Sequence, residues 1–368
     1  MNDVGILTGS IPKLKQNAFF ILKQSAAVGA ALLIATLIIT ISGFKPMAII
    51  AGIFQALSDD ILGTLRWFTP LIFTGLACSF AFKAGAWNMG VDGQLYMGSV
   101  AATATALGFA HLPGAALLPL VMIAGVLGGM LWALIAGALK VVCGANEIVT
   151  TLLMNYLAFF FSDYCVLGPL KGSGAYAAVM SSDVISESVW FPLLIPNSSV
   201  SIGFVIALAL VTAVFITMKK TTFGYEMTQV GTNASFANYG GIKTQKVFLS
   251  SMAVSGAIAG LAGVVEILGI HHRFPYRFSS SLGFDGIVVA ILANNNPLGV
   301  FLSAGFFAVL KNGSFNIERM SDVPSSMVLV VQAIVILLVG AQFVYRRYKE
   351  QKPDPLKQAA SVHGGGMS

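Results

Sequence analysis

Residues 115–142 read AALLPLVMIAGVLGGMLWALIAGALKVV, and Lys140 is the only charged side chain among them. A helix needs about 20 mostly apolar residues to cross a bilayer, so this stretch predicts a membrane span. The whole chain has the same character: of its 368 residues 56% are hydrophobic and 10% are charged, and the mean hydropathy is +0.83. A soluble domain carries about 25% charged residues. The composition excludes an ordinary cytosolic enzyme, a nucleic-acid reader and a disordered protein, and it predicts an all-α polytopic membrane protein.

Similar apolar stretches recur along the chain and predict about ten spans in total. The predicted spans are 20–43, 66–83, 91–110, 115–142, 146–168, 200–218, 247–270, 284–294, 297–315 and 324–345. The stretch 284–294 is too short to cross a bilayer alone, so we expect it to be half of a broken or re-entrant helix. The predicted organisation is an N-terminal segment (1–17), a transmembrane domain (18–347) and a disordered polar tail (348–368).

The distribution of basic residues predicts the orientation of the spans. With the N-terminus inside, 14 of the 21 Lys and Arg residues fall in inside segments and 7 in outside segments. Because cytoplasmic loops carry the excess of Lys and Arg, both termini and the loop 219–246 are expected in the cytoplasm. The loop 169–199 is then expected outside. The net charge of +6 follows from the same bias and indicates no nucleic-acid partner.

Residues 85–95, GAWNMGVDGQL, place several glycines beside Asn88, Asp92 and Gln94 at the third predicted span. Irregular backbone at membrane depth occurs only where it is buried in protein or lines water, and a carboxylate there indicates a functional site. The competing interpretation is a cytoplasmic turn whose polar residues cap the third helix. The spacing alone does not decide between the two.

Two further segments carry information. In the loop 224–242, Asn233 is suited to cap a short helix over 234–239 that ends at Gly240-Gly241. Such a helix presents a docking surface or is an ordinary surface helix. Residues 283–299, GFDGIVVAILANNNPLG, predict either a broken element along a solute pathway or a helical hairpin with a polar turn.

Isolated polar residues within the spans have two interpretations. Glu266 in the seventh span and Asn155 in the fifth contact substrate or join helices by hydrogen bonds, and the second role is the commoner one. His271 and His272 lie beside two arginines without a ligand partner at metal spacing, which favours a solvated or partner-docking loop over a metal site. The chain lacks the Gly-x-x-x-x-Gly-Lys-[Ser/Thr] motif for ATP, and we expect no cofactor.

Several of these segments resemble one family. Asn88-Met-Gly-Val-Asp-Gly-Gln-Leu, preceded by Pro70-Leu-Ile-Phe-Thr-Gly-Leu-Ala, is similar to a pattern close to Asn-Ile-Gly-x-Glu-Gly-Gln. Residues 144–156, GANEIVTTLLMNY, and the segments Gly231–Gly263 and Gly283-Phe-Asp-Gly-Ile are also similar. Over about Leu65–Val344 the chain resembles bacterial ABC importer permeases of the branched-chain amino acid, ribose and nucleoside group, and most of all the nucleoside (simple-sugar-type) permeases. Asp92 departs from the Glu of the pattern.

The resemblance implies a type II permease fold, as in cobalamin importers, in the bacterial cytoplasmic membrane. It implies two ATPase subunits, a second permease that is a different homologous chain or a second copy, and an extracytoplasmic substrate-binding protein. It also implies alternating access driven by the partner ATPases, with no enzymatic activity in this chain. A nucleoside is the expected cargo, and riboflavin-like or simple-sugar cargo is the alternative. A secondary transporter that uses Asp92, Glu266 or Asp285 as a proton relay is the rival class.

Two sets of site residues go with this interpretation. The expected polar lining of the substrate pathway is Asn88, Asp92, Gln94 and Asn155. The loop helix near 232–241 matches the coupling helix of the family, which sits in a groove of the ATPase. Its expected contact residues are Gly231, Asn233, Ala234, Phe236, Ala237, Tyr239, Gly240 and Ile242.

Overall fold

The computed structural model describes residues 54–196, 198–279 and 281–320, with Leu37, Thr40 and Ala333. Residues Ala51–Asn316 form one compact unit, and the packing below is that of this unit. The described elements are almost all helical. They are α3 (Ile61–Lys83), α4 (Val91–Gly108), α5 (Gly114–Cys143), α6 (Glu147–Leu167), α7 (Ala175–Ala178), the 3₁₀ turn η1 (Glu187–Val189), α8 (Gly203–Lys220), α9 (Thr222–Thr232), α10 (Ala234–Tyr239), α11 (Thr244–Glu266), the π-helical turn η2 (Ile267–His271), α12 (Leu282–Leu292) and α13 (Pro297–Met320).

Local sequence signals explain where several helices begin and end. Asp60 accepts a hydrogen bond from the Gly63 N–H and caps α3, which therefore begins five residues before the predicted span at 66. Asn146 caps α6 through the N–H groups of Ile148 and Val149. Gly144 ends α5 in the left-handed region, at φ 67°, where a residue without Cβ meets no steric penalty.

Six described helices are long and apolar enough to cross a membrane: α3, α5, α6, α8, the continuous run Thr244–His271 and α13 as far as Ile317. They confirm six predicted spans. Helix α4 forms as predicted but is not among the six, and α12 is short, as expected for half of a broken element. The predicted spans 20–43 and 324–345 lie outside the described residues, so the count of about ten stays a prediction.

Glycines bring α4, α5 and α11 into close contact, and Gly256 and Gly260 of α11 have the small-xxx-small spacing that allows it. A Cβ on Gly260 would lie 2.4 Å from the Gly125 carbonyl oxygen, and one on Gly256 would lie 2.5 Å from the Gly129 carbonyl oxygen. A Cβ on Gly98 of α4 would lie 2.4 Å from the Gly260 Cα. The three backbones therefore touch at positions that no larger residue can occupy.

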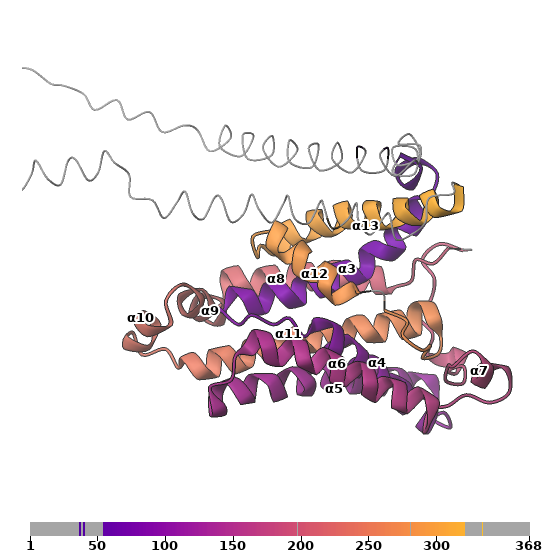
Figure 1. Cartoon of the computed structure of the whole chain (residues 1–368), viewed down its shortest axis with the longest axis horizontal. Coiled ribbons are helices and arrows are strands. Elements are labelled where there is room, and N and C mark those ends of the chain that lie inside the picture. Colours follow the sequence, from indigo (N-terminus) through magenta and orange to yellow (C-terminus); the bar gives the residue numbers. More distant parts are fainter. Residues whose placement is uncertain are drawn as a thin grey trace, which may run out of the picture. The chain divides into compact units, whose positions relative to one another are not determined.

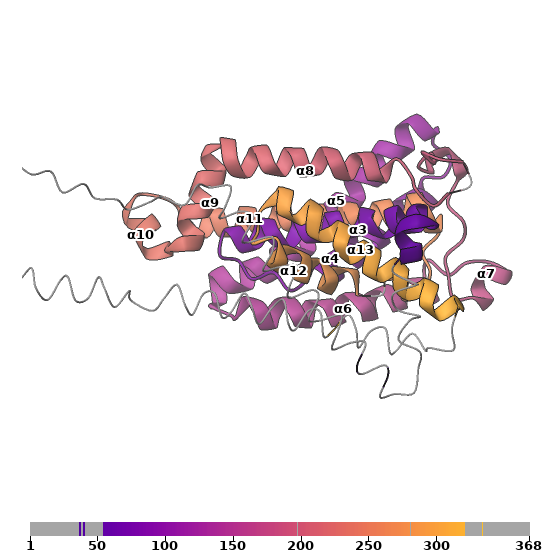
Figure 2. The ribbon, with the colours of Figure 1, turned by 90° about the horizontal axis from the view of Figure 1, so that it is seen from above.

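The two long loops lie at opposite ends of this unit. Helices α9 and α10 lie at one end, and α7, in the loop 169–199, lies at the other (Figures 1 and 2). This placement agrees with the prediction that the loops face opposite sides of a membrane.

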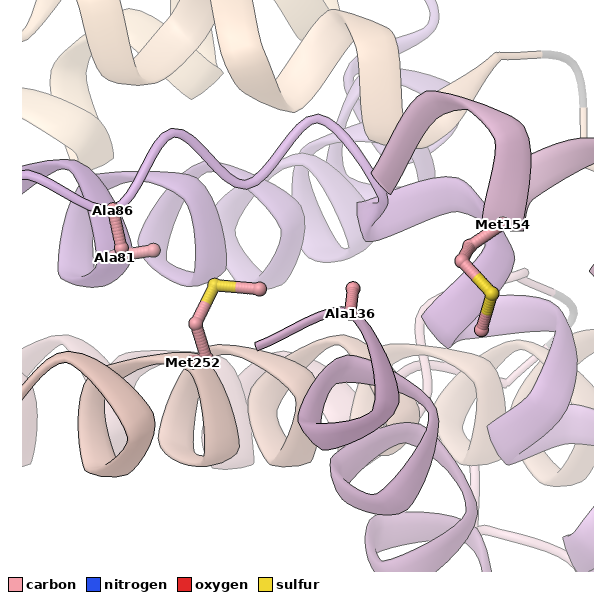
Figure 3. Packing of buried hydrophobic residues seen from close by; sticks show 5 residues of the cluster. All are labelled: Ala81, Ala86, Ala136, Met154 and Met252. Atoms are coloured by element: carbon pink, nitrogen blue, oxygen red, sulfur yellow. The ribbon is translucent and has the colours of Figure 1, made fainter. Parts of the chain in front are cut away.

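Between α3 and α4 the chain turns back into the bundle without helical structure, over residues 85–90. Ala86 of this segment meets Ala81 of α3 and Met252 of α11, in a small apolar core that also includes Ala136 and Met154 (Figure 3). Because the segment re-enters the bundle, α4 begins inside it. We call residues 85–90 the re-entrant segment.

Candidate functional site

The re-entrant segment is held at the middle of the bundle by Asn88, whose side chain is fully buried. Asn88 and Gln94 exchange two amide hydrogen bonds, of 3.0 and 2.8 Å. Asn88 Nδ2 also donates to Ser255 Oγ at 2.9 Å, and Ser255 lies midway along α11. The polar residues therefore lie level with the middle of a helix that is long and apolar enough to cross a membrane, which favours a buried irregular segment over a cytoplasmic turn.

Helix α6 supplies the other hydrogen bonds of the segment. Asn155 Oδ1 accepts from the Gly93 N–H at 2.8 Å, and its Nδ2 donates to the Met89 carbonyl at 2.9 Å. Thr151 Oγ1 accepts from the Met89 N–H at 3.1 Å. Backbone groups that leave a helix within a membrane need such partners, because no water is present to replace them.

Asp92 joins α4 to the short helix α12. It lies in the first turn of α4, and its Oδ1 accepts from the Gly283 N–H at 2.8 Å in the first turn of α12. A Cβ on Gly283 would lie 2.3 Å from the Asp92 nitrogen, so only glycine fits there. The starts of both helices therefore face one carboxylate, which the partial positive charge of each helix N-terminus stabilises. Asp92 Oδ2 is buried without a hydrogen-bond partner.

The structure brings the predicted pathway residues together and buries them among the described residues. Asn88, Asp92, Gln94 and Asn155 are at most 2% exposed. Every hydrogen bond of Asn88 and Asn155 described above ends on a protein group. Their place in the fold is to hold the irregular backbone, and a contact with substrate stays a prediction.

Two ion pairs inside the spans were not predicted from the sequence. Glu266 forms a bidentate pair with Arg66, with N–O distances of 3.1 and 2.8 Å, and Lys311 Nζ donates to Asp285 Oδ2. Arg66 lies in the first turns of α3, and Lys311 lies within α13. The ring of Trp67 lies against both cations, at 4.2 and 5.1 Å. Their partners are distant in sequence, so no local pattern could have shown these pairs.

The loop between α8 and α11 contains the predicted short helix with its predicted bounds. Helix α10 spans Ala234–Tyr239, and Asn233 caps it by accepting from the Phe236 N–H at 3.0 Å. Phe236 and Tyr239 are 68% and 93% exposed, respectively. Ala237 was expected on the same surface, which is wrong: it is 2% exposed, because successive helical residues turn by about 100° and it faces the protein. Ala234 and Gly240 are exposed, and Ile242 is half-buried.

Gly231, at the end of α9, is exposed and also contacts the start of the re-entrant segment, so its place on the docking surface stays a prediction. A Cβ on Gly231 would lie 2.2 Å from the Lys83 carbonyl oxygen and 3.1 Å from the Gly85 nitrogen. Gly85 adopts φ +77°, which favours glycine. The loop that carries α10 is therefore in direct backbone contact with the segment that carries Asn88.

At the other end of the unit, His271 and His272 lie at the end of the α11 run, and His272 lies against the loop 169–199. His272 stacks on Trp190 with ring centroids 3.9 Å apart, and partial burial lowers its pKa below the ordinary value. The Ser173 N–H and hydroxyl both donate to Asp183 and lower the pKa of that carboxyl. Among the described residues no group of three His, Cys, Asp or Glu side chains could hold a metal.

A bundle of apolar spans in which the first turns of α4 and α12 meet at one buried carboxylate, with a short exposed helix at one end, is typical of a membrane transport protein. The chain belongs to the family of permease components of branched-chain amino acid transport systems, which matches residues 60–340.

Three relatives show how close the similarity is. The guanosine ABC transporter permease NupP of Bacillus subtilis is 34% identical, over 84% of this chain and 90% of its own. The nucleoside ABC transporter permease NupB of Lactococcus lactis is 32% identical, over 76% and 79%. The glucose ABC transporter permease TsgB13 of Haloferax volcanii is 36% identical, over 76% of both chains.

More distant matches include NupQ, a second guanosine permease protein of B. subtilis, and RfuC, a riboflavin import permease protein of Treponema pallidum, both 26% identical. The chain is thus a multi-pass ABC transporter permease, which excludes the rival class of ion-driven transporter. Permeases of this family act with ATPase subunits, and the pair NupP and NupQ implies a second permease as partner.

Proposed function

We propose that this chain forms half of the translocation pathway of an ATP-driven nucleoside importer. The observation that carries the cargo assignment is the 34% identity to the guanosine permease NupP over nearly the full length of both chains. The second candidate cargo is a simple sugar, which the glucose permease TsgB13 favours at 36% identity over a shorter share.

The proposed orientation places α9 and α10 in the cytoplasm with both termini, and the loop 169–199 outside a bacterial cytoplasmic membrane. The 14 basic residues assigned to inside segments support it. Two ATPases then dock below, and an extracytoplasmic binding protein delivers the solute above. In this arrangement the permease makes and breaks no covalent bond.

The proposed coupling surface consists of Phe236 and Tyr239 on α10, with Asn233 capping the helix. Exposed aromatic side chains are typical anchors of protein interfaces. The contact between Gly231 and Gly85 supports a route for the motion, because a shift of α10 must displace the backbone next to the re-entrant segment. ATP-driven movement of α10 would thereby move the start of α4, and with it Asp92 and α12.

Uptake by the assembled transporter tests the cargo and the energy source together. The chain is co-expressed with its partner subunits and reconstituted in vesicles, and uptake of labelled guanosine and labelled glucose is measured with and without internal ATP. We expect ATP-dependent guanosine uptake that stops when the partner ATPase is inactivated. Glucose uptake without guanosine uptake would replace the cargo assignment.

Co-purification tests the coupling surface. Phe236→Asp should leave the permease folded but release the ATPase, because a charge replaces an exposed apolar anchor. Tyr225→Asp on α9, where Tyr225 is 63% exposed, is a matched control outside α10. Full recovery of the ATPase with Phe236→Asp would contradict the assignment.

A further inference from the structure

Helix α6 has two faces of different chemistry. One face is buried against α4 and α5 and includes Thr151, Met154, Asn155, Ala158 and Ser162. The opposite face includes Tyr156, Phe160 and Tyr164, which are 60%, 64% and 67% exposed. Figure 2 shows α6 along one edge of the unit, away from α8. Among the described residues, nothing covers these three rings.

Helix α6 exposes its rings together with Val149, Leu153 and Leu157, whereas α5 and α8 expose no large aromatic side chain. The large exposed hydrophobic residues of α5 are all aliphatic: Leu120, Ile123, Leu127, Leu131, Ile135, Leu139 and Val142. Those of α8 are Val205, Leu208 and Ile216. Aliphatic surfaces of this kind suit lipid tails, which offer no hydrogen bonds. The exposed rings of α6 therefore need a separate explanation.

The hydroxyl of Tyr156 is the feature that lipid does not explain. Along the helix axis Tyr156 lies about 14 Å from the start of α6 and about 16 Å from its end, at 1.5 Å per residue. A tyrosine side chain is too short to reach either membrane surface from there, and tyrosines that face lipid gather at those surfaces. No hydrogen bond joins its hydroxyl to another described residue. Because a phenol without a partner at mid-depth is costly in hydrocarbon, water or a polar solute suits this face better than lipid tails do.

The three rings also have the spacing of a continuous surface. Tyr156, Phe160 and Tyr164 follow one another at intervals of four residues, so they lie above one another on one side of the helix. They extend from mid-depth towards the end of the bundle where the loop 169–199 lies. Such a row offers flat faces to a planar ring and hydroxyl groups to its polar edge.

We propose that Tyr156, Phe160 and Tyr164, the aromatic face of α6, line the aqueous solute pathway and stack on the planar base of a nucleoside. This inference rests on the proposed function for its cargo, but not for the presence of water at the face. Stacking on one ring is modest and tolerates different bases. Several modest sites in a row allow a solute to enter and to leave, whereas one tight site would retain it.

Cysteine accessibility tests whether water reaches the aromatic face. In a Cys143→Ser background, Tyr156→Cys and Phe160→Cys are introduced singly into the assembled transporter in membranes. Both are treated with a charged, membrane-impermeant methanethiosulfonate reagent. Leu131→Cys on α5 is the matched control, since Leu131 also lies near the middle of its helix and is 56% exposed. We expect the two α6 cysteines to react about tenfold faster or more, because the reactive thiolate forms only where water is present.

Protection and uptake test the stacking part. Guanosine should slow the modification of Phe160→Cys, and Phe160→Leu should lower kcat/KM for guanosine uptake about fivefold or more, whereas Phe160→Tyr retains it. Co-purified ATPase in each variant confirms assembly.

The outcomes separate this inference from the cargo assignment. If both α6 cysteines react as slowly as Leu131→Cys, the aromatic face is covered by lipid, by the second permease or by another part of this chain, and the inference is overturned. If they react and the wild-type protein imports guanosine, but guanosine gives no protection and Phe160→Leu transports normally, the stacking is overturned. If the wild-type protein imports no nucleoside, the proposed cargo fails while the labelling still decides the pathway.

Discussion

Asn155 and Tyr156 are neighbours in the sequence but lie on opposite faces of α6, and they differ in almost every respect. Asn155 is 1% exposed, and both of its amide atoms bond to the backbone around the re-entrant segment. Tyr156 is 60% exposed, and its ring contacts Phe159 of the same helix. The difference teaches that neighbouring polar residues of one span can have different roles: Asn155 holds the backbone of the re-entrant segment, whereas Tyr156 stays exposed among the described residues.

The largest expected effect comes from Asn155→Leu. The change leaves the Gly93 N–H and the Met89 carbonyl without their partners, and each buried orphan costs about 1–3 kcal/mol, so we expect a loss of about 4 kcal/mol in the free energy of unfolding. Unfolding by SDS in mixed micelles measures it. The neighbouring Tyr156→Leu should change stability by less than about 0.5 kcal/mol. Equal losses of unfolding free energy in the two variants would contradict the difference between the two faces of α6.

Glu266→Gln tests whether buried charge is structural in the same way. It leaves the Arg66 guanidinium unpaired in the interior, and removing one partner of a buried pair costs about 3–5 kcal/mol. Because glutamine still accepts a hydrogen bond, we expect a loss near the lower limit, of about 3 kcal/mol, in the same measurement. The control is Glu147→Gln, whose partner Lys140 is 39% exposed. That control should lose less than about 1 kcal/mol.

Asp92→Asn sharpens the comparison for the residue that links α4 to α12. Asparagine keeps the acceptor for the Gly283 N–H but makes the hydrogen bond neutral, which costs about 1 kcal/mol. If Asp92 serves the fold alone, guanosine uptake at saturating ATP stays within about twofold of wild type, since that loss leaves the transporter folded. A loss of transport in a protein that still assembles with its ATPase would instead place Asp92 in contact with the solute.

The smallest expected effect lies in the loop 169–199. The pKa of Asp183 is lowered in the folded loop. The stability that the ionised carboxylate gives to the loop is therefore present above the ordinary pKa of aspartate, and it is lost as the pH falls through the lowered value. Asp183→Asn should therefore slightly speed proteolysis of this loop at neutral pH. We also expect acidification to speed proteolysis of the wild-type loop but not of the variant. Cleavage rates of wild type and variant that change in parallel with pH would contradict this. Transport by the variant should match wild type.

The local signals in the sequence were sufficient for much of the fold. The apolar runs predicted the six described spans, and Asn233 with the glycine pair predicted α10 with its bounds. These features depend on residues a few positions apart. The motif around Asn88 likewise indicated an irregular segment.

The candidate site was predicted less completely, and the reason is geometric. Whether Ala237 is buried or exposed depends on how α10 packs against the rest of the unit. The partner of Glu266 is Arg66, which lies 200 positions away in the sequence. The pathway residues were predicted from their polarity, but in the structure they are buried and hydrogen-bonded to other parts of the fold. Tyr156 gave no signal in a chain so rich in apolar residues.

The sequence by itself determined that this chain crosses a membrane as a helical bundle, about where six of its spans lie, and which segment around Asn88 departs from helical structure. Composition and spacing act over one or two helical turns, and they suffice for those properties. Only the tertiary structure decided that the first turns of α4 and α12 meet at Asp92, that Arg66 neutralises Glu266, and that one face of α6 is left exposed among the described residues. Those properties arise where helices distant in the sequence pack together, so the packing alone sets which groups are paired and which remain open.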